Sequence, residues 1–115
     1  MENKENVIVI LTFKFALEII KYCESLQENK KFVIANQLLK SGTSIGANIR
    51  EAQNAESKAD FIHKFKISAK EIEETIYWLE LCKFSENYPT VNNLLDQLTN
   101  ISRIVNKIII TSKQK

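Results

Sequence analysis

The sequence predicts an all-α fold, an antiparallel up-down-up-down four-helix bundle formed by a single domain of residues 1–115. Three observations support this prediction. Apolar residues recur at spacings of three and four along most of the chain, which is the period of an amphipathic helix. One proline and two glycines leave little material for the many turns of a β fold. The stretches where the periodicity lapses are short, and short connections favour antiparallel neighbours.

The composition is typical of a folded globular domain. A chain of 115 residues is long enough for one hydrophobic core without metal or disulfide support. With 44% hydrophobic and 26% charged residues, the composition excludes a disordered chain. The formal net charge of +2 permits an acidic partner without requiring one. Cys23 and Cys82 form no CxxC pair, and we interpret both as buried, reduced thiols.

The first residues give no indication of export or membrane insertion. Glu2 and Glu5 are acidic where a signal peptide is positively charged, and the apolar run of residues 7–11 ends at Thr12 and Lys14. Such a run is far too short to cross a bilayer, which takes about 20 apolar residues. We therefore expect a cytoplasmic protein with no membrane partner.

The first helix is predicted at about residues 7–27 and has two apolar stripes. One stripe comprises Ile10, Phe13, Leu17 and Ile20, and the other comprises Phe15, Ile19, Tyr22 and Leu26. A surface helix of a small monomer needs only one apolar side, so one stripe is expected to face the core and the other to need a partner. The β-branched residues 7–10 leave an extended start as the alternative for that segment.

The second helix, at about residues 31–54, contains the stretch around which the bundle is organised. Its seam toward the core comprises Leu38, Ser41, Ile45, Asn48 and Ala52. Gly42 and Gly46 lie on the adjoining stripe, and each costs about 1 kcal/mol of helix propensity relative to alanine. Close packing against a neighbouring helix must offset this cost.

Polar residues within this seam have two interpretations. The structural one makes them buried residues that hydrogen-bond to a neighbouring helix and fix its register. The predicted polar network comprises Ser41, Ser44 and Asn48, with Glu51 and Glu74 as candidates to complete it. The alternative is that the same cluster binds a ligand.

The third helix is predicted at about residues 58–86. Ser57 precedes it, and Asp60 follows three residues later, as in a helix N-terminal cap. Its apolar positions are Ile62, Phe65, Ala69, Ile72, Ile76 and Leu79. We interpret Tyr77 and Trp78 as core or subunit-interface residues, with base stacking as the alternative.

The fourth helix, at about residues 91–111, follows the break at Tyr88-Pro89-Thr90. Thr90 is the candidate cap for this helix, since a threonine hydroxyl can accept a hydrogen bond from a free N–H of the first turn. The apolar positions repeat at spacings of three and four without a fault; they are Val91, Leu94, Leu98, Ile101, Val105 and Ile108.

Basic residues outnumber acidic ones between residues 30 and 70, by eight to three. The eight are Lys30, Lys31, Lys40, Arg50, Lys58, Lys64, Lys66 and Lys70. Residues 71–86 have the opposite balance, with five glutamates and one lysine. A solvated helix surface is the ordinary interpretation of such charges. The alternative is that these eight residues contact the phosphates of RNA or DNA.

No residues form a convincing catalytic or metal-binding set. His63 is the sole histidine, which excludes an ordinary triad or a multi-histidine metal site within one chain. Residues 41–46 lack the Gly-x-x-x-x-Gly-Lys order of a phosphate-binding loop. Glu71 and Glu74 have no Glu-x-x-His motif beside them to bind a di-iron centre. We therefore predict a non-enzyme with no cofactor and no metal.

Five segments together resemble a known bacterial family. They are QLL (37–39), SIGANIREA (44–52), DFI (60–62), KISAKE (66–71) and ETIYWL (74–79). Proteins of this family are four-helix bundles first described as products of reading frames inside intervening sequences of large-subunit ribosomal RNA genes. The resemblance covers most of the chain and implies a bundle that often assembles into a ring-like homopentamer. Glu73 is a departure, because relatives often have asparagine there.

A related branch of the family implies a nucleic-acid partner. Its members are accessory proteins of diversity-generating retroelements, which bind the reverse transcriptase and its RNA. Those proteins are strongly basic, whereas the net charge of this chain is only +2, which weakens the implication of RNA binding. We therefore expect a non-enzymatic oligomeric interaction scaffold, with an RNA- or DNA-binding accessory protein as the alternative.

Overall fold

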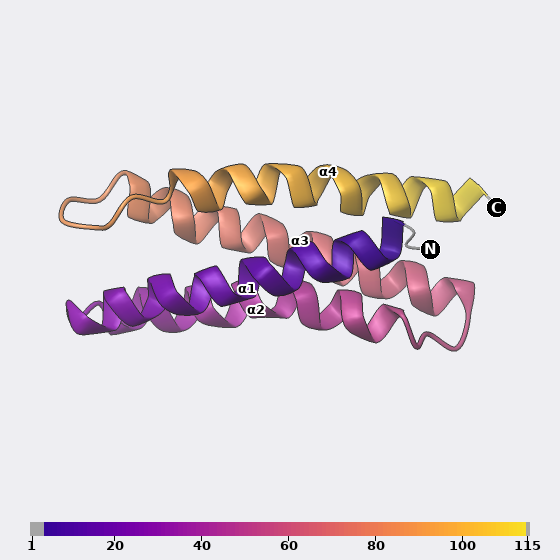
Figure 1. The fold of residues 1–115 in the computed structure, drawn as a ribbon, viewed down its shortest axis with the longest axis horizontal. Helices are drawn as coiled ribbons and strands as arrows, with labels where there is room; N and C mark the ends of the chain where they lie inside the picture. The colour runs from indigo at the N-terminus through magenta and orange to yellow at the C-terminus, as the bar shows by residue number, and fades with distance from the viewer. Residues whose placement is uncertain (1–3, 115) are drawn as a thin grey trace.

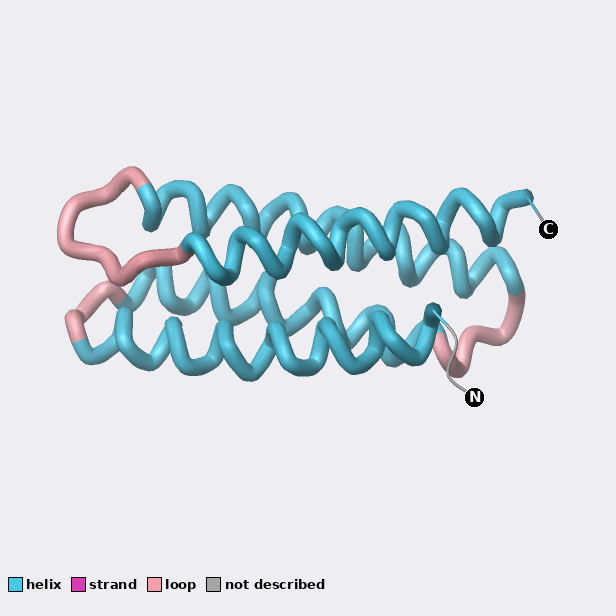
Figure 2. The backbone as a smooth tube through the Cα atoms, turned by 45° about the horizontal axis from the view of Figure 1, so that its top comes forward, coloured by secondary structure: helices cyan, strands magenta, loops and turns pink. Residues whose placement is uncertain are grey.

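The computed structural model describes residues 4–114, with side chains described from residue 7, and these residues form four helices (Figure 1). The helices are α1 (Lys4–Glu28), α2 (Phe32–Ala52), α3 (Lys58–Lys83) and α4 (Asn92–Gln114). Each helix runs antiparallel to the one before it, and the loops lie at the two ends of the molecule (Figure 2). The predicted all-α four-helix fold is thus confirmed.

The four helices occupy the corners of a square in cross-section. Helix α2 packs against α1 and α3, and α4 packs against α3 and α1. Over the described residues, the backbones of the diagonal pairs, α1 with α3 and α2 with α4, do not approach each other closely. Side chains of α1 and α3 still meet in the core, where Tyr22 and Cys82 interact. The molecule measures 48 × 24 × 21 Å, so its length is that of the helices and its width that of two helices side by side.

Helix α1 begins at Lys4, three residues before its predicted start. Residues 7–10 are helical, so the alternative of an extended start is wrong. Ile8 is fully buried in the core, and its packing against the other helices outweighs the β propensity of this segment. The end of α3 also differs from the sequence prediction, because the helix stops at Lys83 rather than near residue 86.

The two predicted helix caps have different outcomes. The Ser57 hydroxyl accepts a hydrogen bond from the Asp60 N–H at 3.0 Å, which confirms the cap of α3. For α4, the Leu95 N–H donates to the Val91 carbonyl at 2.9 Å, so Val91 rather than Thr90 occupies the cap position. The Thr90 hydroxyl is 3.5 Å from the Asn92 nitrogen, at the limit of a hydrogen bond.

The two glycines of α2 lie where α1 and α2 come closest together. A Cβ atom at Gly42 would be 2.9 Å from Cγ2 of Ile19. One at Gly46 would be 3.2 Å from Oγ1 and 3.3 Å from the backbone oxygen of Thr12. Larger residues would push the helices apart, so close packing of α1 offsets the helix-propensity cost of both glycines.

The two cysteines are buried, free thiols, as predicted. Burial, with the nearby Cys82 as a second cause, raises the pKa of the Cys23 thiol to about 11. The neighbouring Tyr22 hydroxyl donates a hydrogen bond to the Pro89 carbonyl at 2.8 Å, which ties α1 to the loop between α3 and α4. Both thiols are therefore protonated and poorly reactive at neutral pH.

The first prediction tests the close approach of α1 and α2. Overpacking costs about 1–3 kcal/mol, whereas alanine in place of glycine gains about 1 kcal/mol of helix propensity. We therefore expect Gly42→Ala to lower the free energy of unfolding measured in urea. In an Ile19→Ala background the obstructing side chain is absent, and Gly42→Ala should then raise this free energy. Equal effects in the two backgrounds would contradict the packing described here.

The second prediction follows from the raised pKa of Cys23. The unfolded chain loses the thiol proton near pH 9, whereas the folded chain keeps it until about pH 11. The unfolded state therefore binds fewer protons in this interval, and the free energy of unfolding should fall as the pH rises through it. Urea titrations at pH 8, 9 and 10 measure this fall, which should be shallower in Cys23→Ala. If the free energy of unfolding fell equally steeply with pH in both proteins, the raised pKa of Cys23 would be refuted.

Candidate interaction surface

The outward side of α1 has a continuous apolar stripe. Its four residues are Ile10, Phe13, Leu17 and Ile20, with exposed fractions from 38% at Ile20 to 50% at Phe13. The other predicted stripe, Phe15, Ile19, Tyr22 and Leu26, is buried in the core. This separation confirms that one stripe faces the core and leaves the other uncovered. Single exposed apolar residues are ordinary on protein surfaces, whereas four aligned on one helix indicate a contact surface.

A shallow groove between α1 and α2 continues this stripe. Its volume is about 250 Å³. Gly46, which has no side chain, and the small Ala47 line the groove from α2, and Phe13 lines it from α1. The Arg50 guanidinium carbon lies 5.5 Å from the centre of the Phe13 ring, a cation–π contact. We call this surface the α1–α2 face; it comprises Ile10, Phe13, Leu17, Ile20, Gly46, Ala47 and Arg50.

The predicted polar network is divided in the structure. Ser41 is buried and hydrogen-bonds to α3, as expected. Ser44 and Asn48 instead bond to carbonyls one turn earlier in α2, at 2.7 and 2.9 Å. Glu51 accepts from Lys64 of α3 at 3.0 Å, and Glu74 accepts from the Trp78 indole of its own helix at 3.2 Å. Ser44 and Asn48 are only half-buried, so an acceptor within their own helix satisfies them.

Two residues that the sequence analysis missed make the buried hydrogen bonds between α2 and α3. The Ser68 hydroxyl donates to the Ile45 carbonyl at 3.0 Å. The hydroxyls of Thr75 and Ser41 hydrogen-bond to each other at 2.9 Å. Ser41, Ser68 and Thr75 are all fully buried, and each has a partner, which supports a structural role for the cluster. Their spacing could have predicted this burial, because Ser68 and Thr75 lie at helical intervals of three and four from the buried Phe65, Ile72 and Leu79.

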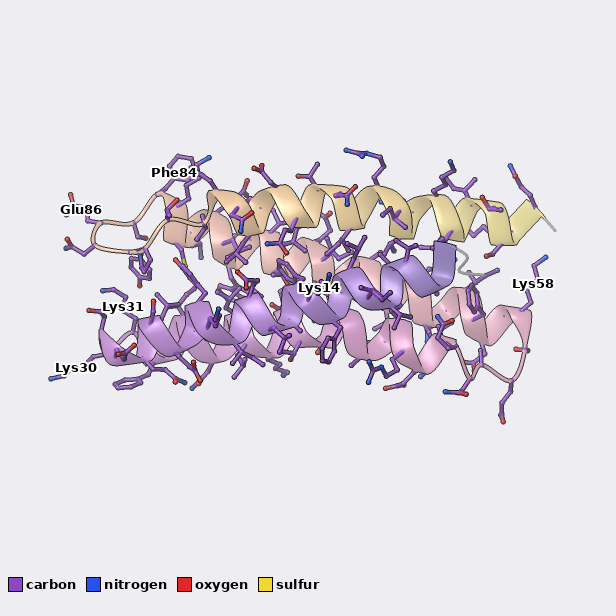
Figure 3. All side chains as sticks on the ribbon, in the orientation of Figure 1. Lys14, Lys30, Lys31, Lys58, Phe84 and Glu86 are labelled. Carbon is purple, nitrogen blue, oxygen red and sulfur yellow. The ribbon has the colours of Figure 1, made fainter. Side chains whose placement is uncertain are left out.

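The eight candidate phosphate-contacting residues are spread along the whole molecule. Lys30 and Lys31 lie at one end of the bundle and Lys58 at the other (Figure 3). The structure therefore does not gather the eight into a single patch. Lys40, Lys66 and Lys70 are exposed along the length of α2 and α3.

Lys31, Arg50 and Lys64 are among the basic residues that contact neighbouring side chains. Lys64 forms an ion pair with Glu51, whose hydrogen bond raises the pKa of the lysine. Lys31 lies over the Tyr88 ring, with its nitrogen 4.5 Å from the ring centre. Arg50 contacts Phe13 as described above. These contacts fit the interpretation of the charges as an ordinary helix surface.

Of the residues considered for chemistry, Glu71 and Glu74 are neighbours on α3, and His63 lies apart from them near the start of the same helix. His63 is exposed on α3. Burial, followed by the negative charge of Glu74, raises the pKa of Glu71. Among residues 7–114, whose side chains the structure describes, no group of three or more His, Cys, Asp and Glu side chains is placed to hold a metal ion. Over the same residues, no helix is long and apolar enough to cross a membrane.

Comparison with known proteins identifies relatives of the whole bundle. The family model described as 23S rRNA-intervening sequence protein matches residues 4–107. The chain is also similar to a crystal structure from Bacteroides thetaiotaomicron VPI-5482, a protein of unknown function from the S23 ribosomal protein family. The two are 42% identical with a TM-score of 0.88, over 93% of this chain and 98% of the other.

No curated protein sequence matches the chain. The family match nevertheless spans all four helices except the last residues of α4. It also includes the glycines of α2 and the exposed stripe of α1, which are the features that position the candidate surface. The chain belongs to the 23S rRNA-intervening sequence protein family.

Proposed function

We propose that the protein is a self-associating, non-enzymatic interaction module whose copies meet through the α1–α2 face. The observation that supports this most strongly is the exposed apolar stripe of α1. The core is complete without these four side chains, because the opposite stripe of α1 fills it. Their exposure costs solvation free energy that burial against a partner recovers.

The free energy gained by burying the α1 stripe can be compared with the cost of association. Full burial of a large apolar side chain is worth about 1.5–3 kcal/mol, so covering four half-exposed ones gives roughly 3–6 kcal/mol. Association itself costs about 4–15 kcal/mol in lost freedom. The stripe alone therefore gives weak association, and a stable complex needs apolar and charged groups from the partner as well.

We propose a closed ring as the form of the assembly, with five copies as the family resemblance implies. Each copy in a ring uses its contact surfaces fully and leaves no apolar stripe exposed. A ring of identical modules presents one repeated outer surface, which suits a scaffold that binds another macromolecule at several points.

A second candidate function is binding of RNA or DNA, alone or beside a reverse transcriptase. The exposed Lys40, Lys66 and Lys70 favour it, and repetition around a ring would multiply a modest number of phosphate contacts. The spread of the basic residues along the bundle gives a single copy only weak affinity. We therefore rank this function second.

The third prediction tests self-association. We expect the wild-type protein at micromolar concentration to have a mass several times the 13.3 kDa of one chain, measured by multi-angle light scattering. Phe13→Glu/Leu17→Glu should be monomeric, because it places charge in the middle of the stripe. Ile110→Glu is the matched control, since Ile110 is 58% exposed on α4 away from this face. A monomeric wild-type protein would disprove self-association.

The fourth prediction tests nucleic-acid binding. If the second candidate is correct, a single-stranded RNA oligonucleotide should bind at low salt, with an affinity that falls steeply as salt rises. Lys66→Glu/Lys70→Glu should weaken this binding, and Arg103→Glu/Lys107→Glu serves as the charge-matched control on α4. Fluorescence anisotropy measures all three proteins. Absence of binding at low salt, or binding indifferent to salt, excludes this function.

A further inference from the structure

We propose that the α1–α2 face of one copy binds the distal half of α3 of the next copy, so that the contact is head-to-tail. This inference rests on the proposed self-association and names the surface that covers the apolar stripe. The second surface, which we call the α3 strip, comprises Glu73, Glu74, Tyr77, Glu80, Leu81 and Phe84.

The α3 strip exposes large apolar and aromatic side chains. Tyr77, Leu81 and Phe84 follow at spacings of four and three and therefore lie on one side of the helix. Their exposed fractions are 56%, 41% and 82%. Phe84 lies at the outer edge of the molecule, where α3 passes into its loop (Figure 3). Like the stripe of α1, this surface is left uncovered by the four helices of one copy.

The acidic residues of the α3 strip lie along the border of its apolar and aromatic residues. Glu73 and Glu80 are exposed four residues before and three residues after Tyr77, so both flank its ring. Glu74 is also exposed and accepts the hydrogen bond of the Trp78 indole. The basic neighbours of the strip are Lys70, one turn before Glu73 and Glu74, and Lys83, whose nitrogen lies 5.7 Å from the centre of the Phe84 ring. Three negative charges and two positive charges give this border a net charge of −1.

Basic side chains border the α1–α2 face. Lys14 and Lys21 are exposed beside the stripe, Lys14 near the middle of α1 (Figure 3). Arg50 lies over Phe13 at the groove. Glu24, one turn after Ile20, and Glu18, which lines a groove with Lys21, are the acidic exceptions. The border of this face therefore has a net charge of +1, opposite in sign to that of the α3 strip.

A two-fold contact of α1 with α1 is less favourable. An antiparallel pairing that covers both stripes is centred at residue 15, with Ile10 opposite Ile20 and Phe13 opposite Leu17. It places the Lys14 residues of the two copies close to each other on the same side of the contact, and such like charges oppose association. Helices α1 and α3, in contrast, occupy diagonal corners of the bundle. One copy can therefore use both surfaces at once, and such heterologous contacts generate rings or filaments.

The experiment that tests this inference combines two variants, each with one surface disabled. Phe13→Glu/Leu17→Glu removes the α1–α2 face, and Tyr77→Lys/Phe84→Lys removes the α3 strip. We expect each variant to be monomeric by sedimentation velocity, with unchanged helicity by circular dichroism. An equimolar mixture retains one intact surface of each kind, so it should form a 1:1 heterodimer with twice the mass of one chain.

Charge-reversal variants give a second test of the contact between the two surfaces. The residues changed are all exposed. Lys14→Glu/Lys21→Glu and Glu73→Lys/Glu80→Lys should each raise the dissociation constant by roughly tenfold, because each creates like-charged borders. Combining all four changes in one chain should restore association. Arg103→Glu/Lys107→Glu, at exposed positions of α4, is the matched control and should have no effect.

The outcomes separate this inference from the proposed function. A monomeric wild-type protein overturns self-association and the inference with it. If Phe13→Glu/Leu17→Glu is monomeric but Tyr77→Lys/Phe84→Lys keeps the wild-type mass, self-association stands and the head-to-tail contact is overturned. A mixture that stays monomeric, or a charge-reversed chain that does not recover, also overturns it.

Discussion

The close approach of α1 to α2 at Gly42 and Gly46 is the constraint on which the rest of the structure depends. Since neither glycine has a side chain, Ile19 and Thr12 of α1 can lie directly against the α2 backbone. That contact fixes the rotation of α1 about its own axis. Once Thr12 and Ile19 face α2 and the core, Phe13 and Leu17 must face outward. The exposed apolar stripe is therefore a consequence of the same packing that holds the bundle together.

The opposite side of α2 meets α3 through hydroxyl groups. Glycines determine how closely helices approach, whereas the hydrogen bonds of Ser41 with Thr75 and of Ser68 with Ile45 determine how they are aligned along their axes. A slip of α3 by one turn would break the hydrogen bond of the buried Ser68 hydroxyl to the Ile45 carbonyl, at about 1–3 kcal/mol, whereas Thr75 also bonds to the Glu71 carbonyl of its own helix. Helix α2 thus positions both of its neighbours, and with them both outward surfaces.

Periodicity was sufficient to predict the helices, the two stripes of α1 and most of the seam of α2, because each depends on residues close in sequence. In that seam, Ile49 is buried and the predicted Asn48 is only half-buried. Periodicity was insufficient for the hydrogen bonds of Ser68 and Thr75, which make sense only once Ser41 and the Ile45 carbonyl are known to lie opposite. The basic residues show the same limit. Antiparallel helices place Lys31 and Lys58 at opposite ends, so nearness in sequence does not produce a patch. The sequence pattern does not show which residues far apart in the chain lie next to each other in the bundle.

The arrangement of charge is more informative about function than its sum. A net charge of +2 produces little long-range attraction for a polyanion, and binding to nucleic acid needs several lysines aligned along a phosphate backbone. Contact between proteins depends instead on charges within about 8–10 Å of each other, the range left by salt screening. Over that range this chain is strongly patterned, since α1 has lysines beside its apolar stripe and α3 has glutamates beside its exposed aromatic residues. Such a pattern has little use in a monomer, and it favours self-association over nucleic-acid binding as the primary role.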